Sequence, residues 1–293
     1  MTRKRYKTID TDTGEVVTGR FYSTEQIEAH ERQKHRQAVK QSSSEPFTFV
    51  EMEGVSRDMG KMTNKDLGYL LILQSYMDWQ NMIKNKPMDK LPMTKQEMQA
   101  VLQIRSEKTL RGLLKRFTER ELINEGSAES YGKSYKAYYI NSAYCFRKSV
   151  IGDNKNRKTD KAVKVFMDSI KDVYKETAIK PADIGFLMRV IPYINYHSNI
   201  LCKDPSKRDH SEAQYMTIAE IAKEVRMSRE ETAKKIASLT WGDKYVFARI
   251  KVGTGSNQII KVNPYVMSRS SGIEALGYEF FVHPETALEQ GAL

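Results

Sequence analysis

The clearest candidate chemistry in this sequence is the binding of a polyanion by cations that recur along one predicted helix. Lys108, Arg111 and Lys115 lie at i, i+3 and i+7, opposite a stripe of leucine and phenylalanine residues. Residues at this spacing share one face of a helix. Arg and Lys side chains there can pair with phosphates or with the O6 and N7 atoms of guanine. Arg105 and Ser106 precede the helix, where unpaired backbone N–H groups can meet a phosphate.

A second segment offers a similar set of polar and basic groups. Its candidate DNA contacts are Arg226, Ser228, Arg229 and Lys234. Further candidate contacts come from the β-prone stretches that follow each predicted helix; they are Lys133, Lys136, Lys251, Asn257 and Lys261. Any amphipathic surface helix also has a charged face, so a simple solvated surface remains the alternative interpretation of both segments.

The two segments belong to two copies of one pattern. Asp66–Tyr76 matches Asp183–Tyr193, and the short matches Met93–Glu97 with Met216–Glu220 and Ile140–Asn141 with Val262–Asn263 follow in the same order. Three matches in register indicate an internal duplication. We therefore expect an N-terminal arm over 1–45, a first domain over 46–150, a second over 151–272 and an acidic tail over 273–293.

Each copy shows the same sequence of local signals. A long apolar stretch, 66–83 or 183–200, predicts a buried helix. Thr94 with Glu97, and Thr217 with Glu220, predict capping boxes that open a short helix. A second helix then starts at Ser106 or Ser228, and two β-prone stretches follow it. This order predicts a mainly α fold with small β-hairpin wings (α+β), made of tandem winged helix-turn-helix domains.

Composition supports a binding protein over other classes. The 293 residues carry 48 Lys+Arg against 37 Asp+Glu, a net charge of +11. Two cysteines and five scattered histidines exclude a disulfide framework and indicate no metal site. The sequence has neither a phosphate-binding Gly-rich loop nor an apolar run long enough for a membrane span. We expect no catalytic residue, no cofactor, no metal, no membrane association, and a cytoplasmic location in a bacterial host.

The second copy carries segments that suggest a family. It resembles the winged-helix replication initiator proteins of Firmicute plasmids and phages (RepL-like). The segments that carry the resemblance are Lys164–Phe166, Ile191–Asn195, Asn199–Cys202, Ile218–Ala222 and Val262–Pro264, with Ile9–Val17 as a similar leader. The resemblance implies binding to double-stranded DNA at an origin, without nickase or ATPase activity. This chain carries two such domains, which leaves a monomer or a homodimer open.

Three functions compete at this stage. A replication initiator would bind origin repeats and recruit replication machinery, a transcription regulator would use the same surfaces at promoters, and a protein–protein adaptor would need no basic helix. We expect Arg111 and Lys115 to contribute more to DNA affinity than Arg189 or Lys175. The second copy has a net charge of +8 against +5 for the first, so we also expect it to contribute the larger share of the DNA affinity. Either half alone, cut near Asn154, should bind far more weakly than the whole chain.

Overall fold

The computed structural model describes residues 8–9, 16–17, 45–58, 61–147, 161–176, 178–207, 213–251, 258–269 and 278–280. Most of the arm predicted for 1–45 and of the acidic tail predicted for 273–293 lies outside these residues, as does Asn257. Within the arm, β1 (Thr8–Ile9) and β2 (Val16–Val17) pair antiparallel. No described helix is long and apolar enough to cross a membrane.

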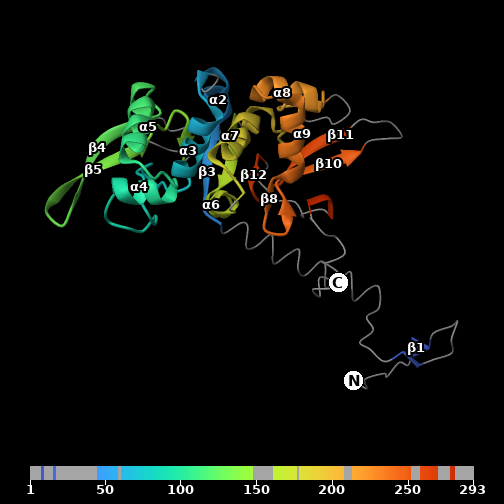
Figure 1. Ribbon diagram of the computed structural model, residues 1–293, viewed down its shortest axis with the longest axis horizontal. Helices are drawn as coiled ribbons and strands as arrows, with labels where there is room; N and C mark the ends of the chain where they lie inside the picture. The colour runs from blue at the N-terminus through green and yellow to red at the C-terminus, as the bar shows by residue number, and fades with distance from the viewer. Residues whose placement is uncertain are drawn as a thin grey trace.

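The two halves of the chain repeat one order of elements (Figure 1). The first half consists of β3 (Phe47–Glu51), α2 (Met52–Asp58), α3 (Asn64–Gln74), α4 (Lys95–Val101), α5 (Glu107–Glu119), β4 (Ile123–Ser130), β5 (Lys133–Ile140) and β6 (Cys145–Phe146). The second half consists of β7 (Ala162–Phe166), α6 (Met167–Lys175), α7 (Pro181–Val190), α8 (Ile218–Val225), α9 (Arg229–Ser238), β10 (Phe247–Lys251), β11 (Gln258–Val262) and β12 (Met267–Ser268). It adds the short elements η3 (Ile191–Tyr193), β8 (Thr240–Trp241), β9 (Lys244–Tyr245) and, after β12, η4 (Tyr278–Phe280).

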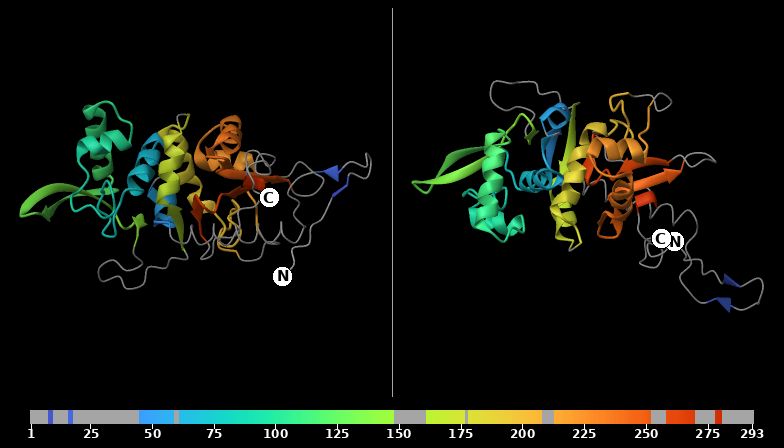
Figure 2. Two further views of the ribbon diagram at one scale, coloured as in Figure 1. Left: turned by 90° about the horizontal axis from the view of Figure 1, so that it is seen from below. Right: turned by 45° about the horizontal axis from the view of Figure 1, so that its top comes forward.

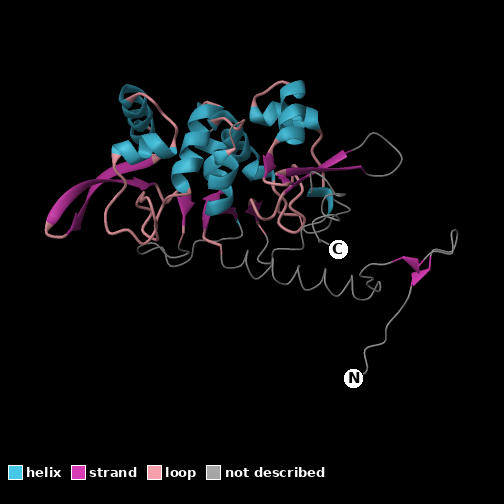
Figure 3. Cartoon of the chain, turned by 60° about the horizontal axis from the view of Figure 1, so that its bottom comes forward, coloured by secondary structure: helices cyan, strands magenta, loops and turns pink. Residues whose placement is uncertain are grey.

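A four-stranded antiparallel sheet joins the halves, in the order β12-β7-β3-β6. Each half contributes its first strand and the short strand that follows its hairpin. The first strands pair with each other, from Phe47 opposite Phe166 to Glu51 opposite Ala162. Figure 3 shows this sheet on the opposite side of the molecule from the helices. The predicted mainly α fold of tandem winged domains is therefore wrong, because the chain is a mixed α and β protein whose central sheet belongs to both halves.

Helices α3 and α7 pack against each other at the centre, between the two outer pairs of helices (Figures 1 and 2). Each helix brings a glycine against the first turn of the other. A β-carbon on Gly68 would overlap with the carbonyl oxygen of Pro181, and one on Gly185 would overlap with that of Asn64. The two contacts are reciprocal, since Asn64 and Pro181 begin the two helices. Reciprocal contacts and the palindromic strand order define an approximate two-fold axis.

The long buried helices predicted for 66–83 and 183–200 end earlier than expected, at Gln74 and Val190. The reason is local competition for backbone hydrogen bonds. Asp78 Oδ1 accepts from the N–H groups of Gln80 and Met82, as Asn195 Oδ1 does from those of His197 and Ser198. Aspartate and asparagine side chains that bind nearby backbone in this way favour turns over helix.

Other local predictions are confirmed. Both capping boxes, Thr94 with Glu97 and Thr217 with Glu220, are formed. The second helices begin directly after Ser106 and Ser228. Leu110, Leu113, Leu114 and Phe117 are all buried, as the stripe on α5 predicts.

Candidate nucleic-acid interface

Helix α5 presents the predicted basic face to solvent. Lys108, Arg111 and Lys115 are exposed, on the side opposite the buried leucines. Arg105 and Ser106 are also exposed at the start of the helix. The Ser106 hydroxyl forms no capping hydrogen bond. The first-turn N–H groups of α5 therefore lack this side-chain acceptor, which suits a helix start that meets an anion.

A groove with a volume of about 360 Å³ runs between α5 and the β4–β5 hairpin. Its cationic lining comes from Lys95, Arg111, Lys115 and Lys136, and its acidic lining from Glu119 and Glu125. Lys133, the other predicted contact on this hairpin, is exposed at the start of β5. Four cations along one groove can neutralise phosphates of a nucleic-acid backbone.

Three of the four cations of this groove are paired with carboxylates. Arg111 bonds Glu107 at 2.8 Å and Lys136 bonds Glu125 at 2.6 Å, while Lys115 lies 3.7 Å from Glu119. The bond from Arg111 lowers the pKa of Glu107, and the bond to Glu125 raises the pKa of Lys136. Both groups therefore keep their charge near neutral pH. A phosphate that enters the groove must compete with these carboxylates for the same cations.

This competition predicts a gain of affinity. Removing the carboxylate charge in a Glu107→Gln, Glu125→Gln variant should tighten binding to duplex DNA by about two- to fivefold for each substitution, the range expected of exposed ion pairs. Fluorescence anisotropy at fixed salt measures this effect. Glu53→Gln is the matched control, since Glu53 is also exposed and paired with Lys161 but lies away from α5. An equal gain for Glu53→Gln would show that only net charge matters.

In the second half, fewer of the predicted contact residues form a basic face like that of α5. Arg226, Ser228, Arg229 and Lys234 are exposed. Arg226 adopts a left-handed conformation that ends α8, and Ser228 caps α9 by accepting from the N–H of Glu231. When Ser106 is aligned with Ser228, the positions of Arg111 and Lys115 on α5 correspond to Ala233 and Ala237 on α9.

The hairpin of the second half is also less basic at its surface than its sequence indicates. Lys251 is exposed at the end of β10. Lys261 is only 18% exposed, because it pairs with Glu279 at 3.4 Å and lies 5.9 Å from the ring of Phe280. Arg189, chosen from sequence as a comparison residue, is buried and bonds Asn64 and the carbonyl of Met62. Every predicted contact residue of the first half is thus exposed, whereas in the second half Lys261 is half-buried and Asn257 lies outside the described residues.

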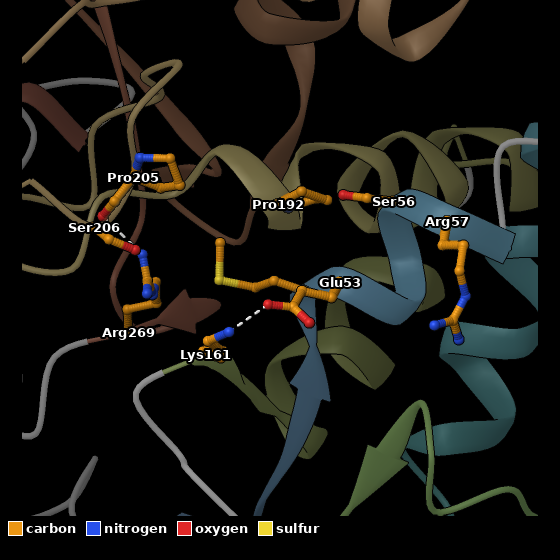
Figure 4. A pocket seen from close by; sticks show the side chains of 9 residues that line it. Glu53, Ser56, Arg57, Lys161, Pro192, Pro205, Ser206 and Arg269 are labelled. Atoms are coloured by element: carbon orange, nitrogen blue, oxygen red, sulfur yellow. Dashed lines mark hydrogen bonds and ion pairs between the residues drawn. The ribbon is translucent and has the colours of Figure 1, made fainter.

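A second cavity lies between α2 and loops of the second half (Figure 4). Its volume is about 600 Å³, and its lining includes the ion pair of Glu53 and Lys161 and the buried side chain of Arg269. Arg269 donates to the carbonyls of Ile194 and Pro205 and thereby fixes the loop that borders the cavity. These contacts give Arg269 a structural role. In the described part of the chain, no group of three or more His, Cys, Asp or Glu residues could hold a metal ion.

Comparison with known proteins gives no relative: no family model, no curated protein and no solved structure matches the chain. The residues of the two helix pairs and their hairpins are therefore the basis for inferring a function.

Sequence reasoning did not identify Lys95 and Glu125 as parts of the groove. Lys95 follows the capping residue Thr94, and nothing in the sequence distinguishes it from an ordinary first-turn residue of a short helix. Glu125 lies beyond the apolar start of β4 at Ile123, yet the strand continues to Ser130. The alternation of Glu125, Ser127 and Glu129 on one strand face is a signal that could have extended the predicted strand.

Proposed function

We propose that this chain is a sequence-specific double-stranded DNA-binding protein that uses α5 as its main contact helix and α9 as a second one. The observation that carries the proposal is the groove of four cations between α5 and the β4–β5 hairpin. A helix with exposed cations beside a hairpin suits a major groove and its flanking phosphates. The resemblance to replication initiators of Firmicute plasmids and phages supports an origin as the target, with a promoter as the alternative.

The approximate two-fold axis adds a property of the DNA site. Since α4–α5 and α8–α9 are related by rotation about the contact of Gly68 and Gly185, they offer their helices in opposite directions. DNA that meets both pairs must present its two half-sites as an inverted repeat. The half-sites should differ in sequence, because α5 and α9 differ in their outer residues.

Selection of bound sequences from random duplexes tests both the sequence-specific binding and the inverted arrangement of the half-sites. We expect enriched sequences with two unequal halves in inverted orientation. On such a duplex, an Arg111→Ala, Lys115→Ala variant should bind at least about tenfold more weakly. The slope of log affinity against log salt concentration should also become shallower by about two. A Lys61→Ala, Lys175→Ala variant removes the same charge from exposed positions outside α5 and should keep the affinity. Equal binding by the Arg111 and Lys115 variant and the unmodified chain would refute the proposal.

Footprinting on the plasmid or phage genome that encodes the chain separates the two biological roles. Repeated sites close to an origin support initiation, whereas sites that overlap promoters support regulation.

A further inference from the structure

The first turn of each central helix carries an aspartate that binds a cation on the contact helix of its own half. Asp66 of α3 accepts two hydrogen bonds from Arg116 of α5, at 3.0 Å from Nε and 2.8 Å from Nη2. Asp183 of α7 pairs with Lys235 of α9. The two aspartates are equivalent, since each is the first residue of its copy of the repeated segment. Each half thus holds its contact helix to a central helix by an ion pair.

The two cations come from different positions of their helices. When Ser106 is aligned with Ser228, Arg116 corresponds to Ser238 and Lys235 corresponds to Leu113. Both halves therefore form the ion pair, although their sequences supply it differently. The pair is thus a feature of how the helices are arranged rather than a remnant of shared sequence.

The two central helices cross each other two residues beyond these aspartates, at Gly68 and Gly185. Because a β-carbon on either glycine would overlap with backbone of the other helix, α3 and α7 fit together in one close arrangement. The helices α5, α3, α7 and α9 are therefore joined in series by an ion pair, the glycine crossing and a second ion pair. Figures 1 and 2 show the four helices in this order across the molecule.

The ion pairs supply a directional constraint that apolar packing does not. Burial of the leucine stripe of α5 holds that helix to the core, but the hydrophobic effect has no preferred direction. Two parallel hydrogen bonds between a guanidinium and a carboxylate fix both the distance and the relative orientation of the groups. In the second half the carboxylate of Asp183 is itself held, because its other oxygen accepts from the N–H of Lys180 at 2.7 Å. The pairs can therefore fix how α5 and α9 are oriented relative to the central helices.

We propose that Asp66 and Asp183 are positioning residues that set the spacing between the two DNA half-sites, an inference that rests on the proposed function. A carboxylate repels phosphate, so the contribution of each aspartate to binding comes through the contact helix that it holds. With α5 and α9 fixed relative to the glycine crossing, only half-sites at one separation and one helical phase can meet both helices together. Bases are thus selected by the contact helices, and spacing is selected by residues at the centre of the molecule.

Duplexes that differ only in the spacer between the half-sites test this proposal. Anisotropy at fixed salt compares the selected duplex with one whose spacer is longer by about two base pairs, which rotates one half-site by roughly 70° relative to the other. For the unmodified chain, this change should weaken binding at least about tenfold, because the two helices can no longer bind together. We call this ratio of affinities the spacing penalty. Asp66→Asn should reduce it by about three- to fivefold, the upper range for an exposed ion pair.

Two further measurements separate positioning from other roles of Asp66. On a duplex that carries only the half-site contacted by α5, Asp66→Asn should bind within about twofold of the unmodified chain. Arg116→Gln, alone and together with Asp66→Asn, should reduce the spacing penalty by the same factor, because each variant breaks the same pair. Asp172→Asn is the control; it removes the carboxylate that pairs with Lys175 on α6 and should leave the spacing penalty unchanged.

Three outcomes would overturn the inference while leaving the proposed function intact. The first is an unchanged spacing penalty in Asp66→Asn, and the second is an equal reduction in Asp172→Asn, which would indicate a general loss of rigidity. The third is equal binding of both spacers by the unmodified chain. In each case, weak binding of the Arg111 and Lys115 variant would still support the proposed function. Absence of salt-dependent duplex binding by the unmodified chain would overturn the proposed function and this inference together.

Discussion

Gly68→Ala is expected to destabilise the protein by more than about 3 kcal/mol, as is Gly185→Ala. The added β-carbon would overlap with a backbone carbonyl of the other helix, which cannot rotate away as a side chain can. Helices α3 and α7 would have to move apart, and the tightly packed residues around them would lose contacts. Losses of this size are rare for a single methyl group and identify a close backbone approach.

Gly112→Ala is the matched control for this result. Gly112 also lies in a helix of the first half, but its nearest neighbour to an added β-carbon is a terminal nitrogen of Arg116 at 3.7 Å. Here alanine should stabilise by up to about 1 kcal/mol, because glycine is a poor helix former. Urea unfolding of the three variants gives the comparison. Similar stability of Gly68→Ala and Gly112→Ala would contradict the close crossing of α3 and α7.

Separating the two halves should abolish folding rather than give two small DNA-binding domains. Residues 67–74 of α3 and 183–190 of α7 are all buried, and most of these side chains are apolar. A single half would expose this surface and would also lose the pairing of β3 with β7. Apolar surface of this kind causes unfolding or aggregation in isolated chains. The halves thus depend on each other for stability, in addition to any effect on DNA affinity.

Expression of fragments 1–152 and 153–293, separately and together, measures this dependence. We expect neither fragment alone to show a cooperative unfolding transition as a monomer. When the two are mixed, a one-to-one complex with a single transition should form. The cut lies outside the described residues, so no described contact is broken by it. A monomeric fragment that unfolds cooperatively would show that the halves are independent domains.

The sequence predicts those parts of the fold that depend on neighbours along the chain. The stripe of Leu110, Leu113 and Phe117 repeats with the period of a helix, so both the helix and its exposed basic face follow from the sequence. The capping box of Thr94 and Glu97 spans only four residues, so it is also predictable from the sequence.

The central sheet was missed because its pairing is distant in sequence. Phe49 in β3 lies opposite Lys164 in β7, more than a hundred residues away, and the outer strands β6 and β12 have two residues each. No period can be recognised in so short a strand. Lys261 was misjudged for a related reason, because the residues that cover it, Glu279 and Phe280, come from beyond the second copy.

The reciprocal glycine contact also bears on how this chain could evolve. In a symmetric homodimer, one codon specifies both copies of a surface, so any substitution in a DNA-contacting helix appears twice. A single polypeptide that carries two copies escapes that constraint, while Gly68 and Gly185 keep the reciprocal contact between the copies. Each helix can then diverge by itself, as Arg111 on α5 and Ala233 on α9 illustrate. In a fused pair of this kind, each half can acquire substitutions that suit its own half of an asymmetric DNA target. Two identical subunits cannot do this, because every substitution appears in both.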